Sequence, residues 1–516
     1  MGGNELTVVE QRYEAVSPAD FFYRNRDIAG FSNPVRALYS AVRELVENSL
    51  DACEVARTPP DIYITLTEVE KTETGSSIYR IRVEDNGCGV PEEHIPSCFG
   101  RVFFGSKYTL KQTRGTFGLG GTMAILYGQI TTHKPVKVVS STDGVNVHTF
   151  ELMIDIQNNR PIILKKSSAK SRRGWRGTIV EFHLEGEYGR AASRIVEYLR
   201  QTAMVNPHAN IVFIDPRGRL YLFERATTKV PRPPKEVKPH PHGVDVETMR
   251  RMIAATKCDN MLDFIVNHFH RVGKATAKKF LKFAGISPRK NPKKMTPDDV
   301  VKLVRAARMF NDFLRPDASC LSPIGAKLLE MGIRKELKLG PDVFLMAHQR
   351  RPSAYSGYPF IVEVAIAYGK GVPKREGGFT LYRFANKIPL LYDEASDVSW
   401  KVVNKVINWS TYKVTQDMPI LIVTHICSTK IPYKTVGKEF VADRPEIEHE
   451  IEQAIRYVAR HLRLYISRQR KIEREKRRLG VYSKYLPRIA RYSAHLADRP
   501  KPPDVEVLLK EVSSFE

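Results

Sequence analysis

The chain lacks long hydrophobic runs. Among its 516 residues, no stretch approaches the roughly 20 consecutive apolar positions that a helix needs to cross a bilayer. The opening residues, MGGNELTVVEQRYEAV, carry acidic side chains and lack the apolar core of a signal peptide. We therefore expect a cytoplasmic protein that has no membrane partner.

The chain is also poor in cysteine, and the spacing of its six cysteines fits none of the usual zinc sites. No two of them form a CxxC pair. His240 and His242 lie in the segment KPHPHGVD, where the flanking prolines favour a linker over a metal site. Free thiols in a reducing compartment are the expected state of the cysteines.

Acidic residues are outnumbered by basic ones. The 57 Asp and Glu residues face 82 Lys and Arg residues, which gives a net charge of +25. This excess favours a polyanion as partner, although composition alone does not separate DNA, RNA and an acidic protein. The length suggests about two to four domains.

Changes in composition divide the chain. The segment 229–243, KVPRPPKEVKPHPHG, is rich in proline and basic residues and is typical of a linker. A helical pattern follows to about residue 310, and the segment 313–325 opens a region of mixed strands and helices. The chain is thus expected to have an N-terminal part, a helical part and a mixed part.

The mixed part contains strand and helix patterns in alternation. Strands are expected at 359–369, 378–386 and 418–429, and a helix is expected at 399–409. Strand–helix–strand order favours a right-handed crossover between parallel strands. From Glu446 onward, apolar residues recur at spacings of three and four, which predicts one face of a long helix that runs on into a charged segment.

One helical stretch of the N-terminal part carries a distinctive polar pair. Residues 43–54 read RELVENSLDACE, and Glu44 and Asn48 are four positions apart, so they share a helix face. On a surface helix this pair is only part of a solvated stripe. On a helix that faces a phosphate pocket, it is a base beside a metal ligand.

A predicted strand ends in an acidic residue and two glycines. IYRIRVEDNGCGV gives Asp85, Gly87 and Gly89 in a DxGxG pattern. Glycine lets a ligand approach the backbone. The carboxylate of Asp85 can accept a hydrogen bond from the exocyclic amine of adenine. Taken alone, the pattern also fits a tight turn with a solvated aspartate.

A glycine-rich loop and a late strand complete the set of patterns. Gly115, Gly118, Gly120 and Gly121 precede an apolar helical stretch, so backbone N–H groups and a helix N-terminus can face phosphates. The loop is neither a Walker A sequence nor a strand-opened GxGxxG fingerprint, and a flexible surface loop remains the alternative. Thr178 opens a β-branched strand and could donate its hydroxyl to an adenine-bound water.

In this order, the four patterns resemble the GHKL ATPase superfamily, which includes DNA gyrase B, the mismatch-repair protein MutL, the large heat-shock chaperones and the histidine kinases. The resemblance implies that Glu44 is the general base for ATP hydrolysis, that Asn48 is the Mg²⁺ ligand and that Asp85 binds adenine. It also implies that residues 115–121 form a lid over the phosphates.

Longer stretches narrow the resemblance to one family. AGFSNPVRALYSAVRELVENSLDA, FGRVFFGSKY, PHPHGVD, LYRFANKIPLLYDEASDVSWKVV and HICSTKIPYKTVGKE resemble the B subunits of the type IIB DNA topoisomerases, the topoisomerase VI family, over almost the whole chain. The implied fold is α+β and multidomain. The expected parts are an N-terminal strap (1–20), a GHKL (Bergerat) ATPase α/β sandwich (21–228), a linker and helix–two-turn–helix domain (229–310), a ribosomal-S5-like transducer domain (311–470) and a C-terminal helical segment that contacts the A subunit (471–516).

The same resemblance assigns the nucleotide-binding residues. Besides Glu44, Asn48 and Asp85, the implied residues are Gly87, Gly89, Ser106, Lys107, Gly115, Thr116, Phe117, Gly118, Leu119, Gly120, Gly121, Thr122 and Thr178. Thr122 stands where the family usually has a lysine, and Gly105 stands where the archaeal pattern tends to serine. Side-chain contacts at these two positions therefore differ from the family pattern, whereas backbone contacts to phosphates do not.

A transducer lysine touches the γ-phosphate in this family and its relatives. The segment STKIPYKTVGK offers Lys430, Lys434 and Lys438. In the gyrase loop an aromatic residue precedes this lysine by five positions, and the pair Tyr433 and Lys438 fits that spacing best. The resemblance therefore implies that Lys438 is both a catalytic and an ATP-binding residue.

The resemblance also implies partners. Two copies would dimerise when ATP binds, and the opening residues would strap over the neighbouring protomer. Closure would capture one DNA duplex while the separate, DNA-cleaving A subunit of topoisomerase VI cuts another in an A2B2 heterotetramer, so that strand passage relaxes supercoils and decatenates duplexes. An archaeal, nucleoid-associated protein is expected.

Two other functions fit parts of the sequence. One is a non-catalytic DNA clamp or scaffold that ATP binding switches, and the other is a MutL-like repair ATPase. The helical segment 244–310 and the sequence STKIPYK speak against the second of these.

Overall fold

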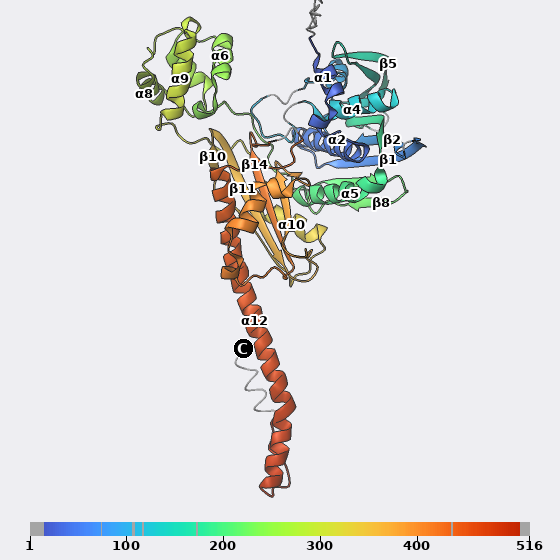
Figure 1. Ribbon diagram of the computed structural model, residues 1–516, viewed down its shortest axis with the longest axis vertical. Helices are drawn as coiled ribbons and strands as arrows, with labels where there is room; N and C mark the ends of the chain where they lie inside the picture. Colours follow the sequence, from blue (N-terminus) through green and yellow to red (C-terminus); the bar gives the residue numbers. More distant parts are fainter. Residues whose placement is uncertain are drawn as a thin grey trace, which may run out of the picture.

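The protein consists of three folded parts and a long projecting helix (Figure 1). The computed structural model describes residues 15–505 apart from residues 74, 106–108, 116–117, 172–173 and 435–436. Most of the predicted strap, the end of the C-terminal segment and the predicted site residues Ser106, Lys107, Thr116 and Phe117 therefore lie outside the described residues.

The N-terminal part is built on a sheet that has eight strands in the described residues, in the order β5-β4-β3-β6-β2-β1-β7-β8. Strands β1 and β7 are parallel, and the other neighbours are antiparallel. The strands are β1 (Asp61–Lys71), β2 (Ser77–Glu84), β3 (Val136–Ser141), β4 (Asn146–Asp155), β5 (Arg160–Lys170), β6 (Gly177–Gly186), β7 (Asn210–Ile214) and β8 (Leu220–Phe223).

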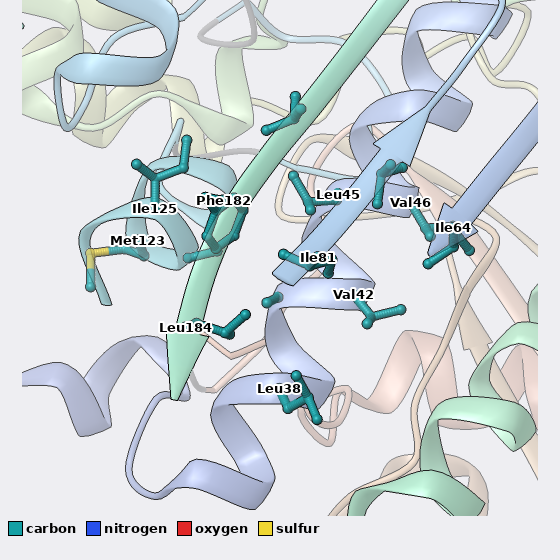
Figure 2. Packing of buried hydrophobic residues seen from close by; sticks show 14 of the residues in the cluster. Leu38, Val42, Leu45, Val46, Ile64, Ile81, Met123, Ile125, Phe182 and Leu184 are labelled. Atoms are coloured by element: carbon teal, nitrogen blue, oxygen red, sulfur yellow. The ribbon is translucent and has the colours of Figure 1, made fainter. Parts of the chain in front are cut away.

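Helices pack on this sheet through one apolar layer. They are α1 (Pro18–Arg24), α2 (Pro34–Ala56), α3 (Ile95–Gly100), α4 (Gly120–Thr132) and α5 (Tyr188–Val205). Figure 2 shows Leu45 of α2 close to Ile81 of β2, and helix α4, which carries Met123, beside Phe182 of β6; all four residues belong to one cluster of buried apolar side chains. Strand β2 buries every second residue, as expected for a strand with one face against a core.

Local sequence explains where helix α2 begins. Asn33 caps the helix, because its side chain accepts a hydrogen bond from the N–H of Arg36 (2.9 Å). Pro34 takes the first helical position, where its missing N–H costs nothing. This start fixes the faces of the helix and thereby sends Glu44 and Asn48 toward the same side.

The helical part confirms the helical pattern that the sequence predicts up to about residue 310. Its helices are α6 (Val246–Ala255), α7 (Met261–His268), α8 (Lys274–Ala284) and α9 (Pro297–Met309). Asp245, Asn260 and Thr296 cap α6, α7 and α9, and Thr296 forms a reciprocal capping box with Asp299. The four helices enclose their own apolar core.

The third part is built on a second sheet. Its strands lie side by side in the order β10-β11-β14-β12-β13, and β9 also pairs with β11. Helix α10 (Ala326–Glu336) packs against it and also against α5 of the first part. The strands are β9 (Phe344–Gln349), β10 (Ser353–Tyr355), β11 (Tyr358–Tyr368), β12 (Thr380–Ala385), β13 (Ile388–Pro389) and β14 (Ile420–Ser428).

The predicted strand–helix–strand unit is present, but its helix is shorter than expected. Strands β12 and β14 are parallel. Between them, the α-helix α11 covers only Val398–Lys401, and a π-helical turn follows over Val402–Val406. The indole N–H of Trp409 donates to the carbonyl of Val403 (2.8 Å), which takes an acceptor that a longer α-helix would use.

Helix α12 (Pro445–Leu496) begins against the third part and extends from it into solvent. Its buried apolar face is formed by Ile447, Ile451, Ile455, Val458, Leu462 and Ile466, which pack on the second sheet. Beyond Ile466 the helix projects away from the body (Figure 1), so the division expected at residue 470 falls inside one continuous helix.

Candidate nucleotide-binding site

A cavity of about 350 Å³ lies between α2, the end of β2, the start of α4 and the start of β6. Its volume lies in the range of sites that hold small organic ligands. The residues predicted from the sequence that line it are Glu44, Asn48, Asp85, Gly89, Gly115, Gly118, Leu119, Gly120, Gly121, Thr122, Thr178 and Lys438. Patterns up to about 390 residues apart in the chain thus meet in one cavity.

A larger cavity of about 1870 Å³ lies between the helical part and the third part. Lys430 and Lys434 line this larger cavity, whereas Lys438 lines the smaller one. The carboxylates, the glycine-rich loop and the start of α4 all meet at the smaller cavity. We therefore take the smaller cavity as the candidate nucleotide site.

Glu44 and Asn48 face the first residues of helix α4. A side chain at Gly120 would collide with the Glu44 carboxylate, and one at Gly121 would lie 3.0 Å from the amide nitrogen of Asn48. Two glycines therefore allow α4 to begin directly against α2. The carboxylate and the amide lie at the positive end of the α4 dipole, which is also where a phosphate binds favourably.

Four buried charges meet at this end of the cavity. The Lys438 ammonium lies 2.9 Å from the Glu47 carboxylate and 3.7 Å from the Glu44 carboxylate. The Arg43 guanidinium donates to Glu44 (2.6 Å) and to the carbonyl of Gly437 (2.9 Å). The attraction between the two positive and the two negative side chains offsets the cost of removing each charge from water.

The charges of this cluster follow from burial and proximity. Burial raises the pKa of Glu47, and the neighbouring Lys438 ammonium opposes that shift. Burial lowers the pKa of Lys438, but the carboxylates of Glu44 and Glu47 outweigh it and hold the pKa above its ordinary value. Lys438 is therefore positively charged at neutral pH.

Asp85 is held at the opposite wall of the cavity by three donors. Its carboxylate accepts hydrogen bonds from the Ser49 hydroxyl (3.0 Å) and from the backbone N–H groups of Gly87 (2.9 Å) and Thr178 (3.2 Å). Burial nevertheless raises the pKa of Asp85 to about 6. The three donors fix the orientation of the side chain and leave it ionised at neutral pH.

Glycines bring the surrounding segments close to Asp85. A side chain at Gly177 would collide with the backbone carbonyl of Asp85, so β6 begins in contact with the end of β2. A side chain at Gly87 would lie 2.6 Å from the Cβ of Ala52 on helix α2. Gly87 thus lies beside the cavity and shapes it, whereas the residues that line the cavity include Gly89 but not Gly87.

The sequence reasoning missed several buried charges at the site. Arg43 and Glu47 join the cluster around Lys438, and Arg114 lies at the base of the glycine-rich loop with only 4% of its surface exposed. The signal for the first two was present, because charged residues recur at three- and four-residue spacings along α2 on a helix that is otherwise apolar. No local pattern marks Arg114.

The donor set at Asn48 suits a magnesium ion bound mainly by phosphates. No group of three or more His, Cys, Asp or Glu side chains in the described part of the chain could hold a metal ion alone. Magnesium commonly takes one or two protein oxygen ligands and completes its shell with phosphates and water. The amide of Asn48, which faces the first turn of α4, fits that role.

Two family models match separate parts of the chain. The model described as "Histidine kinase-, DNA gyrase B-, and HSP90-like ATPase" matches residues 33–185, which hold Glu44, Asn48, Asp85 and the glycine-rich loop. The model described as "Topoisomerase VI B subunit, transducer" matches residues 316–478, which hold Lys438 and most of the third part. The two matches thus cover both sides of the candidate site.

Curated relatives match nearly the whole chain. A protein of Metallosphaera sedula, named as the B subunit of type 2 DNA topoisomerase 6, is 44% identical over 485 residues, which are 93% of this chain and 90% of that protein. A protein of the same name from Saccharolobus islandicus is 43% identical over the same shares of both chains. Among solved structures, the ATPase region of Saccharomyces cerevisiae topoisomerase II is 12% identical, with a TM-score of 0.41 over 88% of this chain and 98% of that one.

Proposed function

The chain belongs to the family of type 2 DNA topoisomerase 6 B subunits, and from that premise we propose how its residues hydrolyse ATP. It is the ATPase subunit of a type IIB DNA topoisomerase, which is an isomerase. The sequence patterns alone left two other functions open, a MutL-like repair ATPase and a non-catalytic clamp. Family membership favours the topoisomerase subunit over both.

Glu44 is the general base in this proposal. Its carboxylate is buried in the cavity, and the hydrogen bond from Arg43 (2.6 Å) fixes its orientation. A water molecule between this carboxylate and the terminal phosphate of ATP would lose its proton to Glu44 as its oxygen bonds to the γ-phosphorus, while the bond from that phosphorus to the bridging oxygen breaks and ADP leaves. Glu44 is only 7% exposed, so the carboxylate faces the cavity rather than bulk solvent.

Lys438 and the start of α4 stabilise the charge that develops during this reaction. The ammonium carries a fixed positive charge from the third part of the protein into the cavity. The backbone N–H groups at the start of α4 point toward the same space. Both groups are positioned before the reaction, which is the condition for strong transition-state stabilisation.

Asp85 reads the base of the nucleotide. Its ionised carboxylate accepts a hydrogen bond from the exocyclic amine of adenine. Guanine has a carbonyl oxygen at that position, which the carboxylate would repel. Thr178 donates its hydroxyl to a water molecule bound to adenine. The hydrogen bonds from Ser49, Gly87 and Thr178 keep Asp85 in place for this contact.

Mg²⁺ is the proposed metal. When bound, it neutralises the charge of the ATP phosphates and links them to the protein. Asn48 would hold it through its side-chain oxygen, because the amide lies one helical turn from Glu44 and faces the start of α4. The remaining backbone and side-chain contacts to the phosphates come from residues of the glycine-rich loop.

The domain division supports this assignment of roles. We propose that the ATPase domain ends near the linker, that the helical part is a helix–two-turn–helix domain and that the third part is the transducer. The proposed ranges are 1–20 for the strap, 21–228 for the ATPase domain, 229–310 for the linker and helical domain, 311–470 for the transducer and 471–516 for the C-terminal segment.

The proposed partners are the DNA-cleaving A subunit of topoisomerase VI, double-stranded DNA and a second copy of this chain. ATP binding closes the dimer around one duplex, and the A subunits of an A2B2 heterotetramer cut the other. The net charge of +25 supports contacts to DNA phosphates. Both named relatives are archaeal, and we propose a nucleoid-associated archaeal protein.

The observation that carries this proposal is the meeting of Glu44, Asn48, Asp85 and Lys438 in one cavity at the start of α4. The test is relaxation of supercoiled plasmid by the chain copurified with its A subunit. We expect ATP-dependent relaxation, its loss in Glu44→Ala and no loss in the matched control Glu73→Ala, which changes an exposed carboxylate. Relaxation that survives Glu44→Ala would remove Glu44 from the mechanism.

A further inference from the structure

The base of the glycine-rich loop is bound to the transducer by three consecutive residues. Gln112 exchanges two hydrogen bonds with the backbone of Ser322, at 3.1 Å and 2.7 Å. The carbonyl of Thr113 accepts a hydrogen bond from the side-chain amide of Asn386 (3.1 Å). Arg114 follows and is linked to the transducer through a carboxylate, so the loop begins from a fixed base.

The carboxylate that links Arg114 to the transducer is that of Glu54. The Arg114 guanidinium donates to Glu54 (2.9 Å) and to Asp51 (2.8 Å), both on helix α2. Glu54 also accepts a hydrogen bond from the ammonium of Lys387 (2.8 Å). Burial opposes ionisation of Glu54, but Lys387 and Arg114 outweigh it and lower its pKa. Glu54 is therefore a carboxylate shared between the loop base and the transducer.

Lys387 reaches Glu54 from a tight turn that suits glycine better than lysine. Strands β12 and β13 are joined by Asn386 and Lys387 alone, with φ of +47° and +66°. A two-residue hairpin of this kind needs positive φ at both positions, and Asn-Gly is the preferred pair. A lysine in a left-handed conformation is unusual and points to a role for its side chain.

The Lys387 side chain is completely enclosed. Only 2% of its surface is exposed, and its ammonium donates to Glu54 and to the Ser322 hydroxyl, each at 2.8 Å. An ammonium without partners in such a place would be strongly destabilising, whereas these two acceptors satisfy it. The charge is thus held between the transducer and helix α2.

The turn is also anchored on its transducer side. The backbone N–H of Lys387 donates to Nε2 of His425 (3.0 Å), so the other ring nitrogen carries the proton and donates to Glu363 (2.7 Å). Glu363 accepts hydrogen bonds from the backbone N–H groups of Ile324 (2.9 Å) and Gly325 (2.6 Å) at the start of α10. Glu363 and His425 have no exposed surface, so the anchor is dry and rigid.

We propose that Lys387 is a positioning residue for ATP hydrolysis, which holds Glu54 and, through Glu54, the Arg114 that fixes the base of the glycine-rich loop. It gives the transducer a second contact with the nucleotide site, separate from Lys438. The inference rests on the proposed function, because it assigns the glycine-rich loop to the phosphates of ATP. Lys387 itself does not touch the nucleotide.

The test is steady-state ATP hydrolysis by the full chain with Lys387 changed. In Lys387→Met we expect the KM for ATP to rise about tenfold or more, with kcat changed less, because the loop is no longer held where the phosphates need it. Lys387→Arg keeps a charge that can reach Glu54 and should stay nearer to the wild type. Amide hydrogen exchange at residues 118–123 should become faster in Lys387→Met and not in Lys387→Arg.

A purely structural lysine would give a different result. Loss of folded protein lowers kcat in proportion and leaves KM unchanged, and that outcome in soluble Lys387→Met would overturn the proposal. Lys370→Met is the matched control, since Lys370 is exposed on the turn after β11 in the same domain, and its KM should not change.

A double variant answers the question if Lys387→Met does not fold. Glu54→Gln with Lys387→Met leaves no unpaired buried carboxylate, and its KM should equal that of Glu54→Gln alone if Lys387 acts through Glu54. A further independent rise in KM would overturn that route. Glu44→Ala is measured in parallel, because normal hydrolysis by Glu44→Ala would refute the proposed site, whatever the Lys387 variants do.

Discussion

The ammonium of Lys438 lies 2.9 Å from the carboxylate of Glu47, although 391 residues separate the two in the chain. The contact is buried, and it connects the transducer directly to the helix that carries Glu44 and Asn48. Lys430 lies over the ring of Tyr358 instead, with its ammonium 5.0 Å from the ring centroid. The position of Lys438 gives a direct way to separate the three candidate lysines.

We predict that Lys438→Met lowers both stability and activity. Removing Lys438 leaves two buried carboxylates, Glu44 and Glu47, beside the single guanidinium of Arg43, and breaking a buried ion pair in this way costs about 3–5 kcal/mol in the free energy of unfolding. ATP hydrolysis should fall by about 10²-fold or more, because a preorganised positive charge is lost from the transition state. Urea unfolding and a phosphate-release assay measure the two effects.

The matched control for this prediction is Lys434→Met. Lys434 lines the larger cavity, and its ammonium lies 5.9 Å from the ring centroid of Phe440. Both stability and hydrolysis should change little. Loss of hydrolysis in Lys434→Met with normal hydrolysis in Lys438→Met would reverse the assignment.

Glu44→Ala should separate binding from hydrolysis. Because Glu44 is the proposed general base, we expect hydrolysis to fall by about 10²- to 10⁴-fold. ATP binding should persist, since Asp85, Lys438 and the glycine-rich loop are unchanged. Single-turnover hydrolysis and equilibrium binding of a labelled ATP analogue measure the two properties, and an unchanged turnover rate would show that another group takes the proton.

Gly120→Ala should impair the site by crowding alone. The added Cβ would collide with the Glu44 carboxylate, which must then move away from the start of α4. A displacement of about 1 Å at a catalytic group can reduce kcat by about 10²-fold. Gly189→Ala in α5 is the control, because a Cβ there meets no atom within 4 Å. Equal activity of the two variants would mean that Glu44 does not need its observed position.

Asp85 should make stability depend on pH in a defined window. Its pKa is about 6 in the folded protein against an ordinary value of 3.8. The folded state therefore binds a proton more tightly, and the stability gained from protonated Asp85 is complete below about pH 4 and lost as the pH rises through about 6. The shift corresponds to stabilisation on the order of 3 kcal/mol at low pH.

The Asp85→Asn variant tests this dependence, because an amide does not titrate. The difference in unfolding free energy between wild type and variant should change between about pH 4 and about pH 7 and be constant above that range. Urea unfolding at several pH values gives the difference. Parallel curves for the two proteins would mean that Asp85 does not titrate in this window.

Duplex DNA should bind to the chain through its phosphates. We expect affinity to fall steeply with salt, by about 10³-fold or more between 50 and 200 mM if about six or more phosphates are contacted, and to be equal for unrelated sequences. Fluorescence anisotropy with labelled duplexes measures both. Affinity that does not depend on salt would contradict a phosphate-dominated contact.

The sequence predicts the parts of the site that depend on local geometry. Helical periodicity places Glu44 and Asn48 on one face, and the glycines of the loop lead into a helix, as they do at Gly120. Strand β2 ends immediately before Asp85, as the DxGxG pattern indicates. Each of these features is set by spacing within a few residues, which periodicity can detect.

The missed features depend on how separate domains meet. Lys387 and Glu54 are 333 residues apart, and each is an ordinary charged residue in its own segment. Their pairing arises only when the turn between β12 and β13 brings the Lys387 side chain to α2. The helix expected at 399–409 also differs, since it becomes a π-helical turn after Lys401 and the Trp409 indole binds the carbonyl of Val403 within that turn; neither contact leaves a periodic signal.

The exposed end of helix α12 has a mechanical consequence. Roughly thirty residues follow Ile466 in this helix, Pro487 among them, which at 1.5 Å per residue is about 45 Å of projecting helix. Its first half is clamped to the second sheet, so a tilt of that sheet by about 10° would swing the far tip by about 8 Å. Angular changes too small to disturb the packed core would thus be amplified at the tip into displacements wider than a helical turn.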